Sequence, residues 1–106
     1  MILESRSIIF SEEELVLALR PLMATKALAP ETEPDEIITG LDNEGEVLIT
    51  YKIGADDHTF TSKEVGAAIL NHCIESSIPL PRGSFKELAL RGDHVALIVR
   101  LETGSM

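Results

Sequence analysis

The chain has 106 residues, 44% of them hydrophobic, and carries a formal net charge of −9. This length predicts one domain over residues 1–106. An acidic chain repels phosphate, which argues against nucleic-acid binding, and no apolar run approaches the ~20 residues that a membrane-spanning helix needs. The N-terminus lacks the pattern of a signal peptide, and a single cysteine excludes an internal disulfide. We therefore expect a cytoplasmic protein that binds neither nucleic acid nor membrane.

The first predicted elements are a strand over residues 2–10 and a helix that begins after Ser11. Glu14 lies three residues beyond Ser11, the capping-box spacing at which each side chain bonds the backbone N–H of the other residue. Apolar residues then recur at helical spacing. Pro21 removes one helical hydrogen bond, so we expect the helix to kink or to end there.

The middle of the sequence predicts a β-hairpin. The apolar segments 36–41 and 46–53 flank "DNEG", in which Asn43 and Gly45 are suited to a turn with positive φ. A second turn follows, and residues 58–60 can form a further short strand.

The second half of the chain repeats this order. Thr61 and Glu64 form a second capping-box pair, which starts a helix that should run to about Ser77. Residues 78–82, "IPLPR", end that helix and act as a stiff connector. Residues 85–101 predict a second hairpin with its turn at "RGD".

This order predicts two βαββ-like halves, residues 1–53 and 54–102, which form an internal pseudo-repeat. Phe10 and Phe60 precede the two helices and lie 50 positions apart. Such halves predict an α+β fold with a mostly antiparallel sheet and two helices packed on one face. Strand alternation leaves the other sheet face of mixed polarity, which predicts that a second subunit covers it in a homodimer.

The stretch "LNHCIES" places His72 beside Cys73 in the second predicted helix. Neighbouring helical residues do not face each other, so this pair is poorly placed to act as a nucleophile and its base. Alignment of the two halves puts Cys73 on Met23, a predicted core position, and His72 on Leu22. We expect Cys73 to be buried and inert. His72 is either a hydrogen-bonded, half-buried histidine or a functional one.

Patterns for metal binding and catalysis are absent from the sequence. His58, His72, Cys73 and His94 lack the spacing of zinc ligand sets. There is no glycine-rich phosphate loop and no G-x-S-x-G nucleophile motif. We therefore predict no metal, no cofactor and no catalytic residue.

Negative charge is concentrated in residues 31–57, where nine acidic residues face the single base Lys52. Solubility is the simplest interpretation, and a surface for a basic partner is the other. The residues assigned to that interaction surface are Glu31, Glu33, Asp35, Glu36, Asp42 and Glu44.

Three functions stay open at this point. The first is a non-catalytic protein-interaction or regulatory module that acts as a homodimer. The second is a small-molecule-binding or enzymatic domain with a pocket near His72, where Arg82 or Arg91 would bind an anion. The third is an acidic nucleic-acid mimic that binds a basic partner. We favour the first, because the sequence lacks a catalytic constellation but has an acidic segment and a sheet face of mixed polarity.

Overall fold

The structure, a computed structural model, describes residues 2–80 and 84–102. Within them, six strands and two α-helices follow one another in the predicted order, and a 3-10 helix, η1, follows the first α-helix. The elements are β1 (Ile2–Ile9), α1 (Glu12–Leu19), η1 (Arg20–Lys26), β2 (Glu36–Leu41), β3 (Val47–Ile53), β4 (Asp56–Phe60), α2 (Ser62–Glu75), β5 (Phe85–Arg91) and β6 (His94–Glu102). The predicted α+β class is confirmed.

The strands form two antiparallel three-stranded sheets instead of one continuous sheet. Sheet A has the order β1-β6-β5 and sheet B has the order β2-β3-β4. The two-residue turn Gly54-Ala55 folds β4 directly back onto β3, so β4 extends the first hairpin. β1 takes the corresponding place beside the second hairpin. Each sheet thus combines the hairpin of one predicted half with the first strand of the other, while the internal repeat itself stays a prediction.

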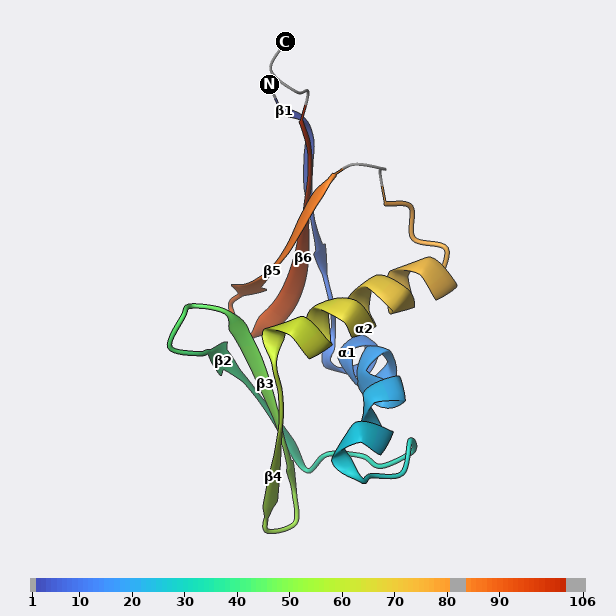
Figure 1. Cartoon of the computed structure of the whole chain (residues 1–106), viewed down its shortest axis with the longest axis vertical. Helices are drawn as coiled ribbons and strands as arrows, with labels where there is room; N and C mark the ends of the chain where they lie inside the picture. The colour runs from blue at the N-terminus through green and yellow to red at the C-terminus, as the bar shows by residue number, and fades with distance from the viewer. Residues whose placement is uncertain (1, 81–83, 103–106) are drawn as a thin grey trace.

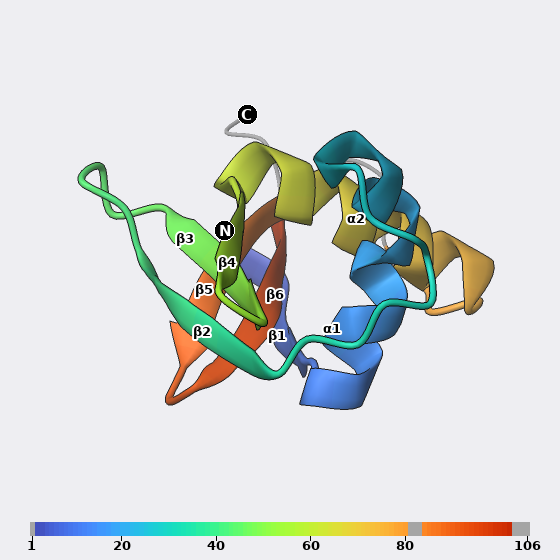
Figure 2. The ribbon, with the colours of Figure 1, turned by 90° about the horizontal axis from the view of Figure 1, so that it is seen from below.

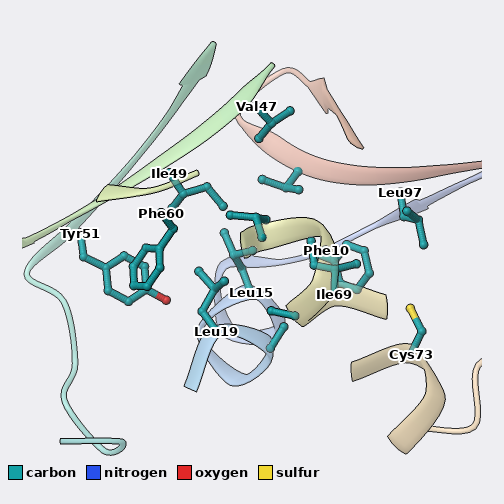
Figure 3. Close-up of a cluster of buried hydrophobic side chains, with 14 of the residues drawn as sticks. Phe10, Leu15, Leu19, Val47, Ile49, Tyr51, Phe60, Ile69, Cys73 and Leu97 are labelled. Atoms are coloured by element: carbon teal, nitrogen blue, oxygen red, sulfur yellow. The ribbon is translucent and has the colours of Figure 1, made fainter. Parts of the chain in front are cut away.

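Both helices lie on the same side of the two sheets (Figures 1 and 2), and a shared hydrophobic core fills the space between them. The inward residues of the two central strands are buried in this core: Val47, Ile49 and Tyr51 in β3, and Val95, Leu97 and Val99 in β6. Figure 3 shows Leu15 and Leu19 of α1 and Ile69 of α2 pointing toward the strand residues. Most of the core is aliphatic, and the aromatic residues Phe10, Tyr51 and Phe60 are buried in it as well.

The first helix begins and ends where the sequence predicts. The Ser11 hydroxyl accepts the backbone N–H of Glu14 at 3.1 Å, which satisfies one free donor of the first turn. The α-helix ends at Leu19, and the chain continues as η1 with Pro21 in its first turn. The proline therefore ends the α-helical hydrogen-bond pattern, but the chain stays helical as a 3-10 helix.

The turn between β2 and β3 differs from the prediction at one residue. Gly45 adopts a φ of 80°, as expected, but Asn43 does not have a positive φ. The reason is the carboxylate of Asp42, which accepts the backbone N–H groups of Glu44 at 2.8 Å and Glu46 at 2.9 Å. This Asx-type turn holds the chain until Gly45, which alone takes the left-handed conformation.

The molecule is elongated, with extents of 54 × 30 × 21 Å and a radius of gyration of 14.8 Å. A compact domain of this length has a radius of gyration of about 13 Å. The long axis follows sheet A, whose far end carries the paired ends of β1 and β6 (Figure 1). Among the described residues, no helix combines the length and the apolar character needed to cross a membrane.

Candidate functional site

His72 lies in the last turn of α2 and links that helix to α1. Its Nε2 lies 2.9 Å from Oε2 of Glu14, and its side chain is 14% exposed. Its ring also packs edge-on against Phe10, with 6.3 Å between the ring centroids. These contacts place His72 between the two helices, with its ring against Phe10 and one ring nitrogen beside the Glu14 carboxylate.

Cys73, the neighbour of His72, is fully buried in the core. Burial raises the pKa of its thiol, with Glu14 acting in the same direction and Arg6 in the opposite one. A buried thiol with a raised pKa holds little thiolate, which is the nucleophilic form. Met23, its partner in the alignment of the two halves, is buried as well.

Tyr51 is the one buried aromatic residue with a polar group. Its ring packs edge-on against Phe60 at 5.0 Å between centroids, but its hydroxyl has no hydrogen-bond partner in the described part of the chain. Burial, and then the charge of Glu33, raises its pKa to about 12. The hydroxyl therefore stays protonated at neutral pH and cannot act as a general base.

The three residues assigned to a ligand pocket are placed differently. Arg82 lies outside the described residues. Arg91 is exposed at the end of β5, where its Nη1 lies 3.3 Å from the carbonyl oxygen of its neighbour Leu90. His72 is engaged between the helices, and neither it nor Arg91 lines the two cavities described below. A small-molecule site at His72 stays a prediction.

Metal binding has no candidate site among residues 2–80 and 84–102. No group of three or more histidine, cysteine, aspartate or glutamate side chains in those ranges is arranged to hold an ion. The residues considered from the sequence are dispersed over different elements: His58 is in β4, His94 begins β6 and Cys73 is in the core.

The acidic segment is divided by the fold into two surfaces. Asp42 and Glu44 lie at the tip of the β2–β3 turn, where Asp42 holds the backbone. Glu33, Asp35 and Glu36 lie at the other end of β2, beside α1. Asp35 also has a structural bond there, since its Oδ2 accepts the backbone N–H of Gly54 at 2.7 Å.

A groove runs between α1, the start of β2 and the β5–β6 turn. It consists of two cavities of about 670 and 590 Å³, which share Glu12, Glu36 and Ile37 as lining residues. We call this the β2 groove. Its apolar lining comes from both sides: Val16 and Leu17 of α1, Ile37 and Ile38 of β2, and the core residues Phe10 and Val95.

The rim of the β2 groove is strongly negative. Its lining includes six carboxylates: Glu12, Glu13, Glu33, Asp35, Glu36 and Asp93. Among the lining residues of the two cavities, Arg20 alone carries a lysine or arginine charge, and its Nη2 lies 3.9 Å from Oε1 of Glu33. Glu12 and Glu13 come from the first turn of α1, so the groove combines acids that lie more than twenty positions apart in the sequence.

The free edge of β2 lies along this groove. The N–H of Asp42 bonds the carbonyl of Glu46 at 2.8 Å, and hydrogen-bonded pairs alternate along an antiparallel ladder. Ile37 and Thr39 therefore direct their backbone N–H and C=O groups away from β3. In the described part of the chain no strand pairs with that edge of β2.

A second exposed surface is the outer face of sheet A. In β6, Ala96 and Ile98 alternate with the core residues but are themselves only 0% and 8% exposed, and the register places Ile9 beside Ala96 and Phe85 beside Arg100. Ile9 is 56% exposed and Phe85 is 65% exposed, although both are large and apolar. We call this surface the sheet A outer face.

Comparisons with known proteins give no relative for this chain. No family model matches it, and neither does any curated protein or any solved structure. Functional inference therefore depends on the surfaces themselves.

Sequence reasoning found part of these surfaces. It assigned Glu33, Asp35 and Glu36 to an interaction surface but did not include Glu12 and Glu13, whose charges suit the positive end of a helix dipole. It could not find the groove, because β2 and α1 are neighbours only in the folded chain. The exposure of Phe85 has a sequence signal, since strand alternation puts it on the same face as Glu87.

Proposed function

We propose that this chain is a non-catalytic, cytoplasmic protein-interaction module that acts as a homodimer through the sheet A outer face. The observation that carries the proposal is the exposure of Ile9 and Phe85 on that face. Ile9 and Phe85 lie on the two outer strands of this face, opposite Ala96 and Arg100 of β6. Large apolar side chains exposed on a sheet face are typical of a surface that another protein covers.

The centre of the face favours close approach of a second sheet. Across the three strands, Ala96 lies between Ile9 and Ala89, so small side chains occupy the middle of the sheet there. Arg100 is not an unpaired charge that a partner would have to bury alone, because its Nη2 lies 2.7 Å from Oε1 of Glu87. Sheets pack at about 10 Å, a distance that suits small central residues flanked by larger ones.

The surface area of the chain supports the same proposal. Its accessible surface is 6700 Å² for a mass of 11.6 kDa, whereas a compact monomer of that mass exposes roughly 5,800 Å². The difference is close to the ~800 Å² that one partner buries in an interface of standard size. An elongated chain with excess surface and an apolar sheet face fits one half of a symmetric dimer.

Light scattering during size-exclusion chromatography tests the dimer. We expect the wild-type chain to elute at twice its 11.6 kDa mass, and Ile9→Glu and Phe85→Glu to elute as folded monomers, because each buries a charge in the interface. Ile74→Glu is the matched control, since Ile74 is 68% exposed on α2, away from that face. A wild-type monomer at high concentration would contradict the proposal, as would a dimer that survives both substitutions.

A further inference from the structure

We infer that the β2 groove binds an extended, lysine- or arginine-bearing segment of another protein, which adds as a strand to the free edge of β2. The inference rests on the proposed interaction function and names the chemistry of the partner. The groove is formed within one chain, so it does not depend on the dimer.

The first argument is the main chain of β2. Ile37 and Thr39 present backbone donors and acceptors outward, and both residues line the groove. A peptide in extended conformation satisfies such groups by forming one more antiparallel or parallel ladder. The hydroxyl of Thr39 already bonds the carbonyl oxygen of Asp93 at 3.2 Å, which fixes β2 against the β5–β6 turn and keeps its edge in place.

The second argument is the shape and lining of the groove. Its two cavities, about 670 and 590 Å³, are within the range of ligand-binding clefts. Ile38 is 41% exposed on β2, and Leu17 is exposed on the facing helix. Side chains of an added strand that point toward α1 would contact Leu17, whereas the alternate ones would lie beside Ile38 on the other face of β2.

The third argument is charge, and it decides between occupants. The six rim carboxylates and the single Arg20 create a negative potential along the groove. A second copy of this chain would bring a second acidic rim against the first, and nucleic acid would bring phosphates. Both are repelled, whereas lysine and arginine side chains on a partner strand reach carboxylates on either wall.

The probe for a binding test is a random peptide library of about nine residues per peptide, displayed on phage and selected against the purified full chain. We expect the enriched peptides to carry lysine or arginine in alternation with apolar residues. The most enriched sequence, made with a fluorescein label, then serves for fluorescence anisotropy. No enrichment, or enrichment without basic residues, would overturn the inference.

A pair of variants at Thr39 isolates the backbone contribution. Thr39→Pro removes an N–H that points away from β3, so the β2–β3 ladder keeps its bonds. Thr39→Val keeps the N–H and the strand preference but also loses the hydroxyl bond to Asp93. We expect Thr39→Pro to bind the labelled peptide about threefold or more weakly than Thr39→Val, the effect of one hydrogen bond. Equal affinities in two folded variants would exclude strand addition.

A second pair of variants isolates the charge contribution. Glu13→Gln with Glu36→Gln neutralises two rim carboxylates, and Glu44→Gln with Glu75→Gln changes the net charge equally on other surfaces. At low salt we expect the first pair to weaken binding about tenfold, and the second by less than about twofold. Equal effects of the two pairs would show that net charge, and not the groove, attracts the peptide.

The dimer proposal and the inference that the β2 groove binds a peptide can be refuted independently. If the Phe85→Glu monomer binds the labelled peptide with wild-type affinity, the groove is shown to act within one chain. If the wild-type chain is a monomer but binds basic peptides at β2, the dimer proposal is wrong and this inference stands. Amide chemical-shift changes at Ile37 and Thr39 on adding the peptide locate the site, and changes confined to other residues would overturn it.

Discussion

Oε2 of Glu14 lies 2.9 Å from Nε2 of His72, a contact that joins the first turn of α1 to the last turn of α2. The two helices start from the same sequence signal, but only the second completes its capping box. Glu64 returns its carboxylate to the N–H of Thr61 at 3.0 Å. The Glu14 carboxylate instead contacts His72. In α1, a contact between the two helices therefore takes the place of the local capping-box bond.

A double-mutant cycle measures this exchange. We expect Glu14→Ala to lower the free energy of unfolding by about 1 kcal/mol, with a coupling to His72→Leu of about 0.5–1 kcal/mol. Leucine is the natural choice because Leu22 occupies the matched position in the first half. The Ser11 cap uses the backbone N–H of residue 14, so the helix start is retained. Additive losses in urea unfolding would show that the contact does not contribute.

The capping box of α2 predicts a pH dependence of stability. The backbone hydrogen bond from Thr61 is the main cause that lowers the pKa of Glu64 below its ordinary 4.5; desolvation opposes it, and Lys26, 3.3 Å away, assists. A pKa lowered by folding adds stability that is complete above pH 4.5 and is lost as the pH falls through the folded-state value. We expect Glu64→Gln to destabilise the protein at about pH 7 and to have a much smaller effect at about pH 3.

Thr61→Ala is the control for this prediction. It removes the hydroxyl that accepts the N–H of Glu64, at a cost of about 1 kcal/mol, but leaves the Thr61 backbone N–H that holds the carboxylate. Most of its cost should therefore be the same at both pH values. A pH-independent cost of Glu64→Gln in chemical denaturation would contradict the proposed cause.

Tyr51 can be titrated directly, because it is the only tyrosine and the chain has no tryptophan. Burial raises its pKa from 10.0 to about 12, so the tyrosinate absorbance should rise only near the higher value while the chain is folded. The unfolded chain ionises first, so this contribution to stability is present below pH 10 and is lost as the pH rises toward 12. Ionisation near pH 10 in the folded chain would show that the hydroxyl reaches solvent.

Substitution Tyr51→Phe tests the unpaired hydroxyl. The ring contact with Phe60 is retained and a buried polar group without a partner is removed, so we expect the free energy of unfolding to be unchanged or to rise by up to about 1 kcal/mol. Tyr51→Leu, which removes the ring as well, should destabilise the protein by about 1 kcal/mol or more. Thermal unfolding of the two variants distinguishes them. Equal destabilisation would mean that the hydroxyl has a partner.

Cys73 should be inert in the folded chain. The thiol is buried and its pKa is raised, so we expect a disulfide reagent to modify it at least about a hundredfold more slowly than in denaturant. Ala67→Cys in a Cys73→Ala background places a thiol on the exposed side of the same helix and should react at once. Similar rates for Cys73 in the folded wild-type chain and for the thiol of Ala67→Cys would show that α2 opens readily from the core.

Much of the fold could be predicted because its signals are local. Ser11, Thr61 and Pro21 act within one helical turn, and the hairpin turns depend on adjacent residues. The division into two sheets could not be predicted, since both edges of a hairpin accept a third strand and the sequence does not say which. The Asn43 prediction failed because the carboxylate of Asp42 determined the turn through hydrogen bonds that composition does not reveal.

For the candidate surfaces too, the sequence shows local features but not the contacts that form when the chain folds. The charge of Glu33 and Glu36 was visible in the sequence, but their proximity to Glu13 depends on the packing of β2 beside α1. The partner of His72 was equally hidden, because Glu14 already had a local explanation as a capping residue. Residues that satisfy one role in the sequence can take another when the chain folds, and only the structure shows the change.

The exchange of first strands between the two hairpins has a consequence for biosynthesis. β1 is synthesised before the other elements of this fold but pairs with β6, where Ile2 lies opposite Glu102. Sheet B and α2 are complete once residues 36–75 have emerged, whereas β1 cannot pair until β6, residues 94–102, has been synthesised. Because Ile2 and Glu102 lie side by side, the chain is suited to circular permutation. A short linker across those ends, with new termini opened at the Asp42–Gly45 turn, should convert the slowest pairing into a local hairpin and speed refolding.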